Sequence, residues 1–148
     1  MKIREATSLD VSAIVDMSAK FYATTDYRHI ADMCADTVEA LAKTLITSGI
    51  MLVAEDAGEI IGMAGLYIGP FMFNASKTSA YEVVWWVSPD TRGSGAGKEL
   101  LLAIEPAARA KGCASVQMLA LATSPAHTGA MYERLGYGHS ETAYTKVI

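Results

Sequence analysis

The chain has 148 residues, and 51% of them are hydrophobic, so it is long enough for one well-cored domain and too short for two ordinary ones. Its net charge of −4 leaves no broad basic face for a phosphate backbone, which argues against nucleic-acid binding. The two cysteines form no metal-spaced cluster, and the N-terminal residues lack the charged and apolar regions of a signal peptide. We therefore expect one cytoplasmic domain over residues 1–148, with free thiols, no metal and no membrane partner.

Two amphipathic helices are predicted in the first third of the chain. A short strand over residues 2–6 leads to a helix that starts near residue 7 and carries an apolar stripe through residues 11–22. A second helix is expected to begin at Asp36, with Glu39 completing a capping box, and to end at Gly49 in a left-handed cap.

The polar and aromatic connection between these helices has two interpretations. It is either a solvated loop whose aromatic residues cover the edge of the core, or one wall of a substrate pocket. The residues proposed for substrate binding here are Tyr22, Tyr27 and Arg28.

An antiparallel hairpin is predicted next. Apolar runs at 50–54 and 60–68 flank a turn composition at 56–59. The segment that follows, residues 69–79, is expected to be a loop, although it holds adjacent large apolar residues at 71–73. Such an exposed cluster usually marks an interface or a pocket wall. Phe71 and Phe73 are therefore further candidates for substrate binding, and the cluster also suggests a homodimer.

The stretch from residue 80 to residue 100 reads as strand, glycine-rich loop and helix. Residues 83–87 are β-branched or aromatic on both alternating faces, which is typical of a strand buried in the middle of a sheet, and Pro89 ends this run. Glycines at 93, 95 and 97 allow backbone N–H groups to converge at the first turn of a helix, where they can hold a phosphate.

Spacing separates the families that use such a loop. A Walker A loop requires glycine where Arg92 stands and Ser or Thr where Glu99 stands. A dinucleotide fingerprint starting at Gly93 requires glycine at the position of Lys98. The pattern that fits is R-x-x-G-x-G over residues 92–97, directly after a strand.

After the loop, a helical stripe runs to a stop at residues 111–112, and Pro106 predicts a kink near Leu102. Residues 114–121 are a strand candidate, Ser124 and Pro125 mark the start of a last helix, and residues 138–148 are expected to pair at a sheet edge. The predicted order is β-α-α-β-β-β-α-β-α-β, an α/β (α+β mixed sheet) fold with helices on both faces.

This arrangement resembles the GNAT superfamily of N-acyltransferases over nearly the whole chain. The loop at 92–97 is similar to the acyl-CoA pyrophosphate loop of that family, and Met131 to Tyr137 resembles its last-helix signature of tyrosine, a turn, leucine, glycine and an aromatic. Many members carry asparagine at the position of Pro125, so a contact to the pantetheine arm is lost or moved, to Ser124 or His127. The resemblance implies that the chain binds acetyl-CoA as co-substrate through Trp86, Val87, Arg92, Gly93, Ser94, Gly95, Ala96, Gly97 and Ser124.

The resemblance also implies attack of an amine on the acyl-CoA thioester. Glu82, expected on one strand face with Val84 and Trp86, matches a catalytic glutamate of some members, with His127 as the competing base. Backbone N–H groups near Trp86 and Val87 would receive the oxyanion, and Tyr132 matches the residue that protonates the departing thiolate.

Two function classes remain open at this point. One is an N-acetyltransferase that acts on a primary amine of a small molecule or peptide. The other is a catalytically silent acyl-CoA-binding sensor or scaffold.

Overall fold

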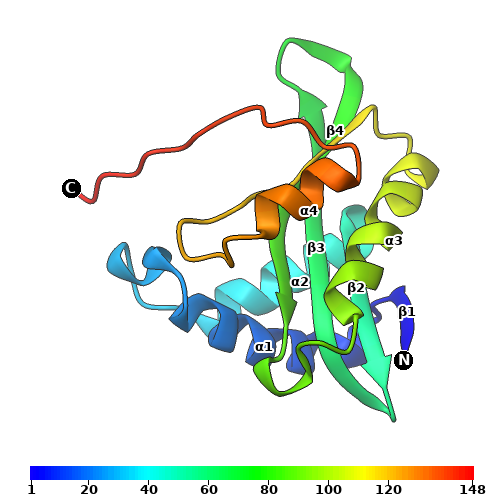
Figure 1. Cartoon of the computed structure of the whole chain (residues 1–148), viewed down its shortest axis with the longest axis vertical. Coiled ribbons are helices and arrows are strands. Elements are labelled where there is room, and N and C mark those ends of the chain that lie inside the picture. The colour runs from blue at the N-terminus through cyan, green and yellow to red at the C-terminus, as the bar shows by residue number, and fades with distance from the viewer.

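The computed structural model describes residues 1–148, whose strands form one five-stranded sheet with the order β1-β2-β3-β4-β5 (Figure 1). All neighbouring strands are antiparallel except β4 and β5, which run parallel. The strands are β1 (Lys2–Glu5), β2 (Ile50–Asp56), β3 (Glu59–Phe71), β4 (Asn74–Val87) and β5 (Ser115–Gln117).

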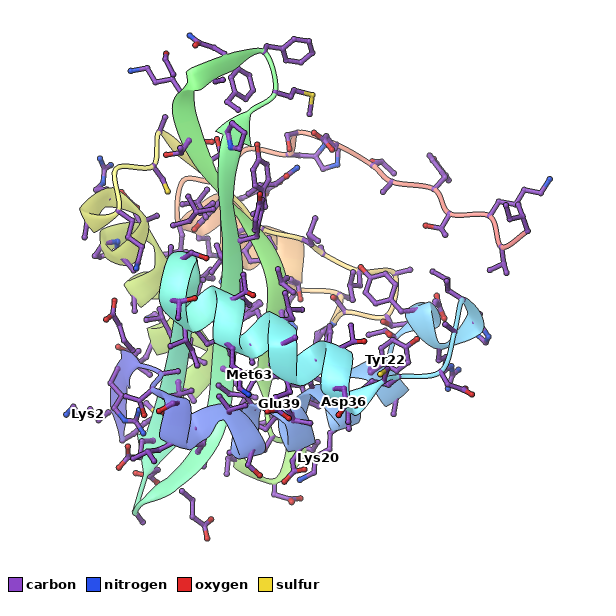
Figure 2. All side chains as sticks on the ribbon, turned by 180° about the vertical axis from the view of Figure 1, so that it is seen from behind. Lys2, Lys20, Tyr22, Asp36, Glu39 and Met63 are labelled. Atoms are coloured by element: carbon purple, nitrogen blue, oxygen red, sulfur yellow. The ribbon has the colours of Figure 1, made fainter.

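Helices cover both faces of this sheet. α3 and α4 lie in front of the sheet in Figure 1, whereas α1 and α2 cover the opposite face, which Figure 2 shows from behind. None of the helices is long and apolar enough to cross a membrane. The helices are α1 (Val11–Ala23), α2 (Ala35–Ser48), α3 (Ala96–Ala110) and α4 (Thr128–Arg134), with short 3-10 turns at Ser8–Asp10, Asp26–His29 and Pro89–Thr91.

Alternation along β2 divides the core into two layers. Ile50, Leu52 and Ala54 pack with the buried face of α3, whereas Met51 and Val53 pack against α1 and α2. Successive side chains of a strand point to opposite faces, so a strand that is apolar throughout must be covered on both sides. The sheet therefore lies in the middle of a three-layer fold.

Arg4 in β1 ties the start of α1 to the sheet. Its guanidinium donates to both carboxylate oxygens of Asp10, at 2.8 and 2.9 Å, and to Glu55 of β2 at 2.6 Å. Asp10 also accepts the N–H of Thr7 and closes a capping box, which confirms the predicted helix start near residue 7. The hydrogen bond from Arg4 lowers the pKa of Asp10 to about 2.

The predicted ends of the second helix need correction. α2 begins at Ala35, with Cys34 as the N-cap residue, and no side chain caps it, so Asp36 and Glu39 do not form the expected box. Gly49 has φ −110° and is not a left-handed cap. Glycine is required there for a different reason, because a Cβ atom at this position would lie 2.6 Å from the carbonyl oxygen of Leu66.

The hairpins confirm one prediction and overturn another. Ala57 and Gly58 both have positive φ between β2 and β3, as expected for a tight turn at 56–59. Residues 69–79 are not a loop, because β3 continues to Phe71 and β4 starts at Asn74. The resulting β3–β4 hairpin projects beyond the rest of the sheet (Figure 1).

The C-terminal third departs from the predicted strands. α3 runs without a break through Pro106. The strand expected over 114–121 is reduced to Ser115–Gln117, and α4 starts at Thr128, three residues after Pro125. Residues 138–148 form no strand, so the last element of the predicted order is absent.

Candidate active site

A pocket of about 650 Å³ opens where β4 and β5 separate. These strands are paired only from Ser79 to Tyr81 on β4, and the two hydroxyls of Ser79 and Ser115 hydrogen bond at 2.7 Å at the start of this pairing. Beyond Tyr81 the strands diverge. The lining comes from the end of β4, the glycine-rich loop, the connection between β5 and α4, and the end of α1.

A β-bulge in β4 decides which way the side chains of the pocket point. Gly65 pairs with Val84, but the next residue of β3, Leu66, pairs with Glu82, so Val83 is an extra residue. The alternation of side chains along the strand predicted that Glu82 shares a face with Val84 and Trp86. This prediction is wrong, because the bulge places Glu82 on the other face. Val84 and Trp86 pack with α1 and α2, whereas Glu82 points toward the segment before α4.

The backbone of Leu119 hydrogen bonds to both suggested catalytic residues, Glu82 and Tyr132. Its backbone N–H donates to Oε2 of Glu82 at 2.7 Å, and its carbonyl oxygen accepts from the hydroxyl of Tyr132 at 2.8 Å. These side-chain bonds take the place of the β4–β5 ladder, which explains why β5 is so short. The sequence contained no signal for this role of Leu119, because the residue lies inside an ordinary apolar run.

Burial changes the acid-base properties of this pair. Desolvation raises the pKa of Glu82 to about 7, against the opposing effects of the Leu119 N–H and of Tyr132. Desolvation also raises the pKa of the Tyr132 phenol, and the negative charge of Glu82 adds to this increase. Glu82 therefore titrates near neutral pH, while Tyr132 stays protonated.

The glycine-rich loop has the geometry of an anion site. Gly93 and Gly95 have φ near +90°, and Gly95 is the N-cap residue of the 15-residue helix α3. Nothing within 4 Å would meet a Cβ atom at either glycine, so the backbone there faces open space. The N–H groups of Ser94 and Ala96 are already bonded within the loop, so those of the three glycines at 93, 95 and 97 are left for a ligand. Together with the positive end of the helix dipole they suit a phosphate, which fits the pyrophosphate of a coenzyme A thioester.

Arg92 and the two tryptophans shape the wall beside this loop. The guanidinium of Arg92 lies 4.6 Å from the ring centroid of Trp86, and its Nε donates to the carbonyl oxygen of Val87 at 3.4 Å. The indole N–H of Trp85 donates to the carbonyl oxygen of Gly97 at 3.2 Å. Trp86 is largely buried against Phe21, and its own indole N–H has no partner.

The pocket gathers most of the residues that the sequence suggested for chemistry and for the cofactor. Glu82 and His127 line it, but Tyr132 does not, because its hydroxyl is directed to Leu119. The lining also includes all the suggested cofactor residues, namely Trp86, Val87, Arg92, Gly93, Ser94, Gly95, Ala96, Gly97 and Ser124.

The suggested substrate residues lie elsewhere. Tyr22, labelled in Figure 2, donates its hydroxyl to the carbonyl oxygen of Tyr27 at 2.9 Å, and Arg28 donates to that of Ala23 at 3.4 Å. Neither they nor Phe71 and Phe73 at the β3–β4 hairpin line the pocket. Phe21 and Thr24 line it instead. Phe21 directly precedes Tyr22 in α1, and Thr24 is the C-cap residue of that helix.

Two comparisons with known proteins bear on this site. A family model described as the acetyltransferase (GNAT) family matches residues 16–137. The chain belongs to this family. The GNAT resemblance inferred from the loop and from residues 131–137 is therefore confirmed.

Solved structures share the GNAT fold of this chain. An acetyltransferase from Trypanosoma brucei is 22% identical, with 99% of each chain covered and a TM-score of 0.72. A transcriptional regulator from Bacillus halodurans C-125 is also 22% identical over 99% of each chain, with a TM-score of 0.77. A predicted acetyltransferase from Clostridium acetobutylicum, solved with acetyl-CoA, is 15% identical over 98% of this chain and 94% of its own, with a TM-score of 0.73. The mixed α/β fold class is thus confirmed.

Proposed function

We propose that this GNAT acetyltransferase transfers an acetyl group from acetyl-CoA to a primary amine of a small molecule or peptide by direct attack. The observation that carries the proposal is the position of Glu82. Its carboxylate lies in the gap between β4 and β5, in the same pocket as the glycine-rich loop, and its pKa of about 7 suits a general base.

The glycine-rich loop supports acetyl-CoA as the donor. The unbonded N–H groups of Gly93, Gly95 and Gly97 would hold the pyrophosphate, and the gap between the strands would receive the pantetheine arm and the thioester. The hydroxyl of Ser124 accepts the N–H of Leu121 at 2.9 Å and keeps its own hydrogen to donate, so it can replace the asparagine that many members carry. His127 and Thr128, which also line the pocket, are the other candidates for this contact.

Glu82 meets the first chemical demand of the reaction. An alkyl ammonium with a pKa near 10.4 has no lone pair, so a proton must leave it before the nitrogen can attack the thioester carbon. Glu82, ionised above a pH of about 7, accepts that proton. The C–N bond then forms, with the oxyanion held by backbone N–H groups near Trp86 and Val87. The C–S bond breaks, and the second proton that the nitrogen loses restores the hydroxyl of Tyr132 after that residue has protonated the thiolate.

Tyr132 is proposed to turn its hydroxyl from the carbonyl of Leu119 into the pocket and to return a proton to the departing thiolate. Desolvation raises the pKa of Tyr132 most and the negative charge of Glu82 raises it further, and both effects oppose this transfer. Once Glu82 has taken the proton of the amine, its charge is gone and Tyr132 becomes a better acid. Proton uptake by Glu82 therefore precedes proton release by Tyr132.

The acceptor amine would enter beside Phe21 and Thr24. These residues lie at the end of α1, and Phe21 packs edge-to-face on Trp86 with ring centroids 5.7 Å apart. An aromatic wall next to a carboxylate suits an amine that carries apolar carbon close to its nitrogen.

Both cysteines are free thiols, and we expect the protein in the cytoplasm.

A silent acyl-CoA-binding sensor or scaffold is the second candidate, and Leu119 favours it. Both backbone groups of Leu119 are bonded to Glu82 and Tyr132, so these side chains could serve only to hold the gap open.

No cluster of three His, Cys, Asp or Glu side chains is placed to hold a metal ion.

Thiol release separates the two candidates. The protein is incubated with acetyl-CoA and a panel of primary amines, and free coenzyme A is followed with a thiol reagent, while calorimetry measures acetyl-CoA binding separately. A transferase binds acetyl-CoA and releases thiol faster with at least one amine than without any. Binding without amine-dependent release over a broad panel would instead establish the silent module.

A further inference from the structure

The guanidinium of Arg92 lies on the face of the sheet that α1 and α2 cover. Its central carbon is 4.6 Å from the ring centroid of Trp86, and Trp86 packs in the core layer of those two helices. The neighbouring residue, Trp85, points to the other face and donates to the carbonyl of Gly97 in the first turn of α3. The charge of Arg92 is therefore on the opposite side of β4 from the first turn of α3.

Arg92 has no partner in the protein for its charge. It takes part in no ion pair, and the only hydrogen bond of its side chain runs from Nε to the carbonyl oxygen of Val87. Its two terminal nitrogens are unbonded, although Arg92 lines the pocket. A guanidinium on an aromatic face still presents the N–H groups at its rim, in the fork that matches a carboxylate. The pocket thus contains an unused group for binding an anion.

The charged residues of the pocket restrict the acceptors that it suits. Glu82 is the one acidic residue among the 22 that line it. The basic lining residues are Arg92, Lys98 and His127. An acceptor with several ammonium groups would find no carboxylate besides the one that takes the proton, and Arg92 would repel it. The lining suits an acceptor with one amine and one anionic group.

The positions of Glu82 and Arg92 also set the length of such an acceptor. Glu82 and Trp86, on which Arg92 lies, are separated by at most roughly 13 Å along an extended strand. Phe21 packs on Trp86 and also lines the pocket, so apolar surface lies beside the guanidinium. An acceptor that reaches both charged groups therefore needs an apolar spacer longer than the single carbon of an α-amino acid.

We propose that the acceptor is an ω-amino acid, in which an apolar spacer joins the primary amine to a carboxylate, and that Arg92 binds this carboxylate. The inference rests on the transferase function proposed above and names its substrate class. Glu82 takes the proton of the amine, Arg92 forms a charge-assisted pair with the carboxylate, and the spacer lies along the wall that Phe21 and Trp86 form. The coenzyme pyrophosphate is left to the glycine N–H groups of the loop.

Matched pairs of acceptors isolate the contribution of the carboxylate. The probes are the ω-amino acids from aminobutanoate to aminooctanoate and their carboxamides, which share the amine and the spacer, with glycine as the short acid. At saturating acetyl-CoA, kcat/KM for the best acid should exceed that for its carboxamide by about tenfold or more, because only the acid forms a charge-assisted pair. The best acid should also exceed glycine. Equal values for acid and carboxamide at every length would overturn the proposal.

Two substitutions separate a carboxylate of the acceptor from the phosphates of the coenzyme. Arg92→Gln should raise KM for the best acid by about tenfold or more, a larger change than in the calorimetric Kd for acetyl-CoA, and should bring the acid-to-carboxamide ratio of kcat/KM close to one. Lys98→Gln, which removes a cation from the first turn of α3, is the matched control and should keep that ratio. If Arg92→Gln weakens acetyl-CoA binding and leaves the ratio unchanged, the guanidinium belongs to the coenzyme site and the proposal is wrong.

Failure of the transferase function itself has a different signature. If no amine releases thiol, calorimetry on the protein saturated with coenzyme A still compares the binding of aminohexanoate with that of its carboxamide. Tighter binding of the acid, lost in Arg92→Gln, would support the carboxylate site in a silent module. Equal binding of the two, or binding of neither, would overturn it.

Discussion

The burial of Glu82 raises its pKa, and the proposed role of this residue as general base depends on that pKa. Because its pKa is about 7, kcat/KM of the unchanged protein should rise with pH through about 7 as the carboxylate ionises. Glu82→Gln should lose that limb and fall about a hundredfold or more near neutral pH, with a smaller loss as the pH approaches the amine pKa. The measurement is a pH-rate profile of both proteins with one accepted amine. Parallel profiles would show that Glu82 is not the base.

The same pKa has a consequence for stability. The folded-state pKa of Glu82 lies above its ordinary value of 4.5, so its contribution to stability is present below pH 4.5 and is lost as the pH rises through about 7. Glutamine does not ionise, so Glu82→Gln removes this pH-dependent loss of stability, which is on the order of 3 kcal/mol at most. Urea unfolding at pH 5 and pH 8 should therefore show the variant gaining stability relative to the unchanged protein at the higher pH. An equal difference at both values would mean that the carboxyl is not desolvated.

Tyr132 has two possible roles that a single substitution separates. Tyr132→Phe leaves the Leu119 carbonyl without its donor, which costs about 1–2 kcal/mol of stability in either role. If the hydroxyl is the general acid, turnover also falls at least about a hundredfold while acetyl-CoA affinity is unchanged. Stopped-flow thiol release and calorimetry measure the two quantities. Near-normal turnover in a destabilised variant would assign Tyr132 to positioning Leu119 alone.

At the scale of elements, the loop before α3 carries a prediction about cofactor binding. Gly95 has φ +89°, so a side chain there strains the backbone, whereas a Cβ atom at Gly97 meets only ordinary contacts with Val87 and Trp85 at 3.5 and 3.6 Å. Gly97→Val should therefore fold and lose at least about tenfold in acetyl-CoA affinity, because its branches crowd the N–H groups of the first turn. Leu102→Val, exposed on the same helix, is the control for helix propensity. Equal affinity of both variants by calorimetry would remove the loop from the cofactor site.

A second prediction at this scale concerns the junction between α2 and β2. Gly49→Ala places its Cβ 2.6 Å from the Leu66 carbonyl oxygen, and the backbone there is held in the sheet. We expect a loss of about 1–3 kcal/mol in the free energy of unfolding. Gly129→Ala in α4 meets nothing within 4 Å and should gain about 0.5–1 kcal/mol. Urea denaturation measures both, and similar values for the two would contradict the close contact.

At the scale of the whole molecule, the β3–β4 hairpin offers an exposed apolar tip. Met72 and Phe73 are 78% and 84% exposed, and the ring of Phe73 packs edge-to-face on that of Phe71. We expect a partner molecule, most simply a second copy, to cover this tip. Changing all three residues to Ser should weaken self-association measured by sedimentation. A variant with unchanged association and unchanged kinetic constants would show the tip to be free.

The local sequence was sufficient where a structure depends on neighbours in the chain. The tight turn at Ala57 and Gly58, the glycine-rich loop and the apolar stripes of α1 and α3 were all predicted, because backbone freedom and helical period act within a few residues. Together these signals were enough for the fold class, the GNAT resemblance and the position of the glycine-rich loop.

Tertiary structure decided what depends on contacts between distant segments. The pairing register against β3 makes Val83 a bulge residue in β4. The bulge places Glu82 on the sheet face that carries α4, which the alternation of side chains along β4 did not predict. Leu119 is not part of the β4–β5 ladder, because its N–H bonds to Glu82 and its carbonyl oxygen bonds to Tyr132, which lie 37 and 13 residues away in the sequence. The strand pattern of 138–148 could not become a strand alone, because a strand exists only when a partner supplies the other half of its hydrogen bonds.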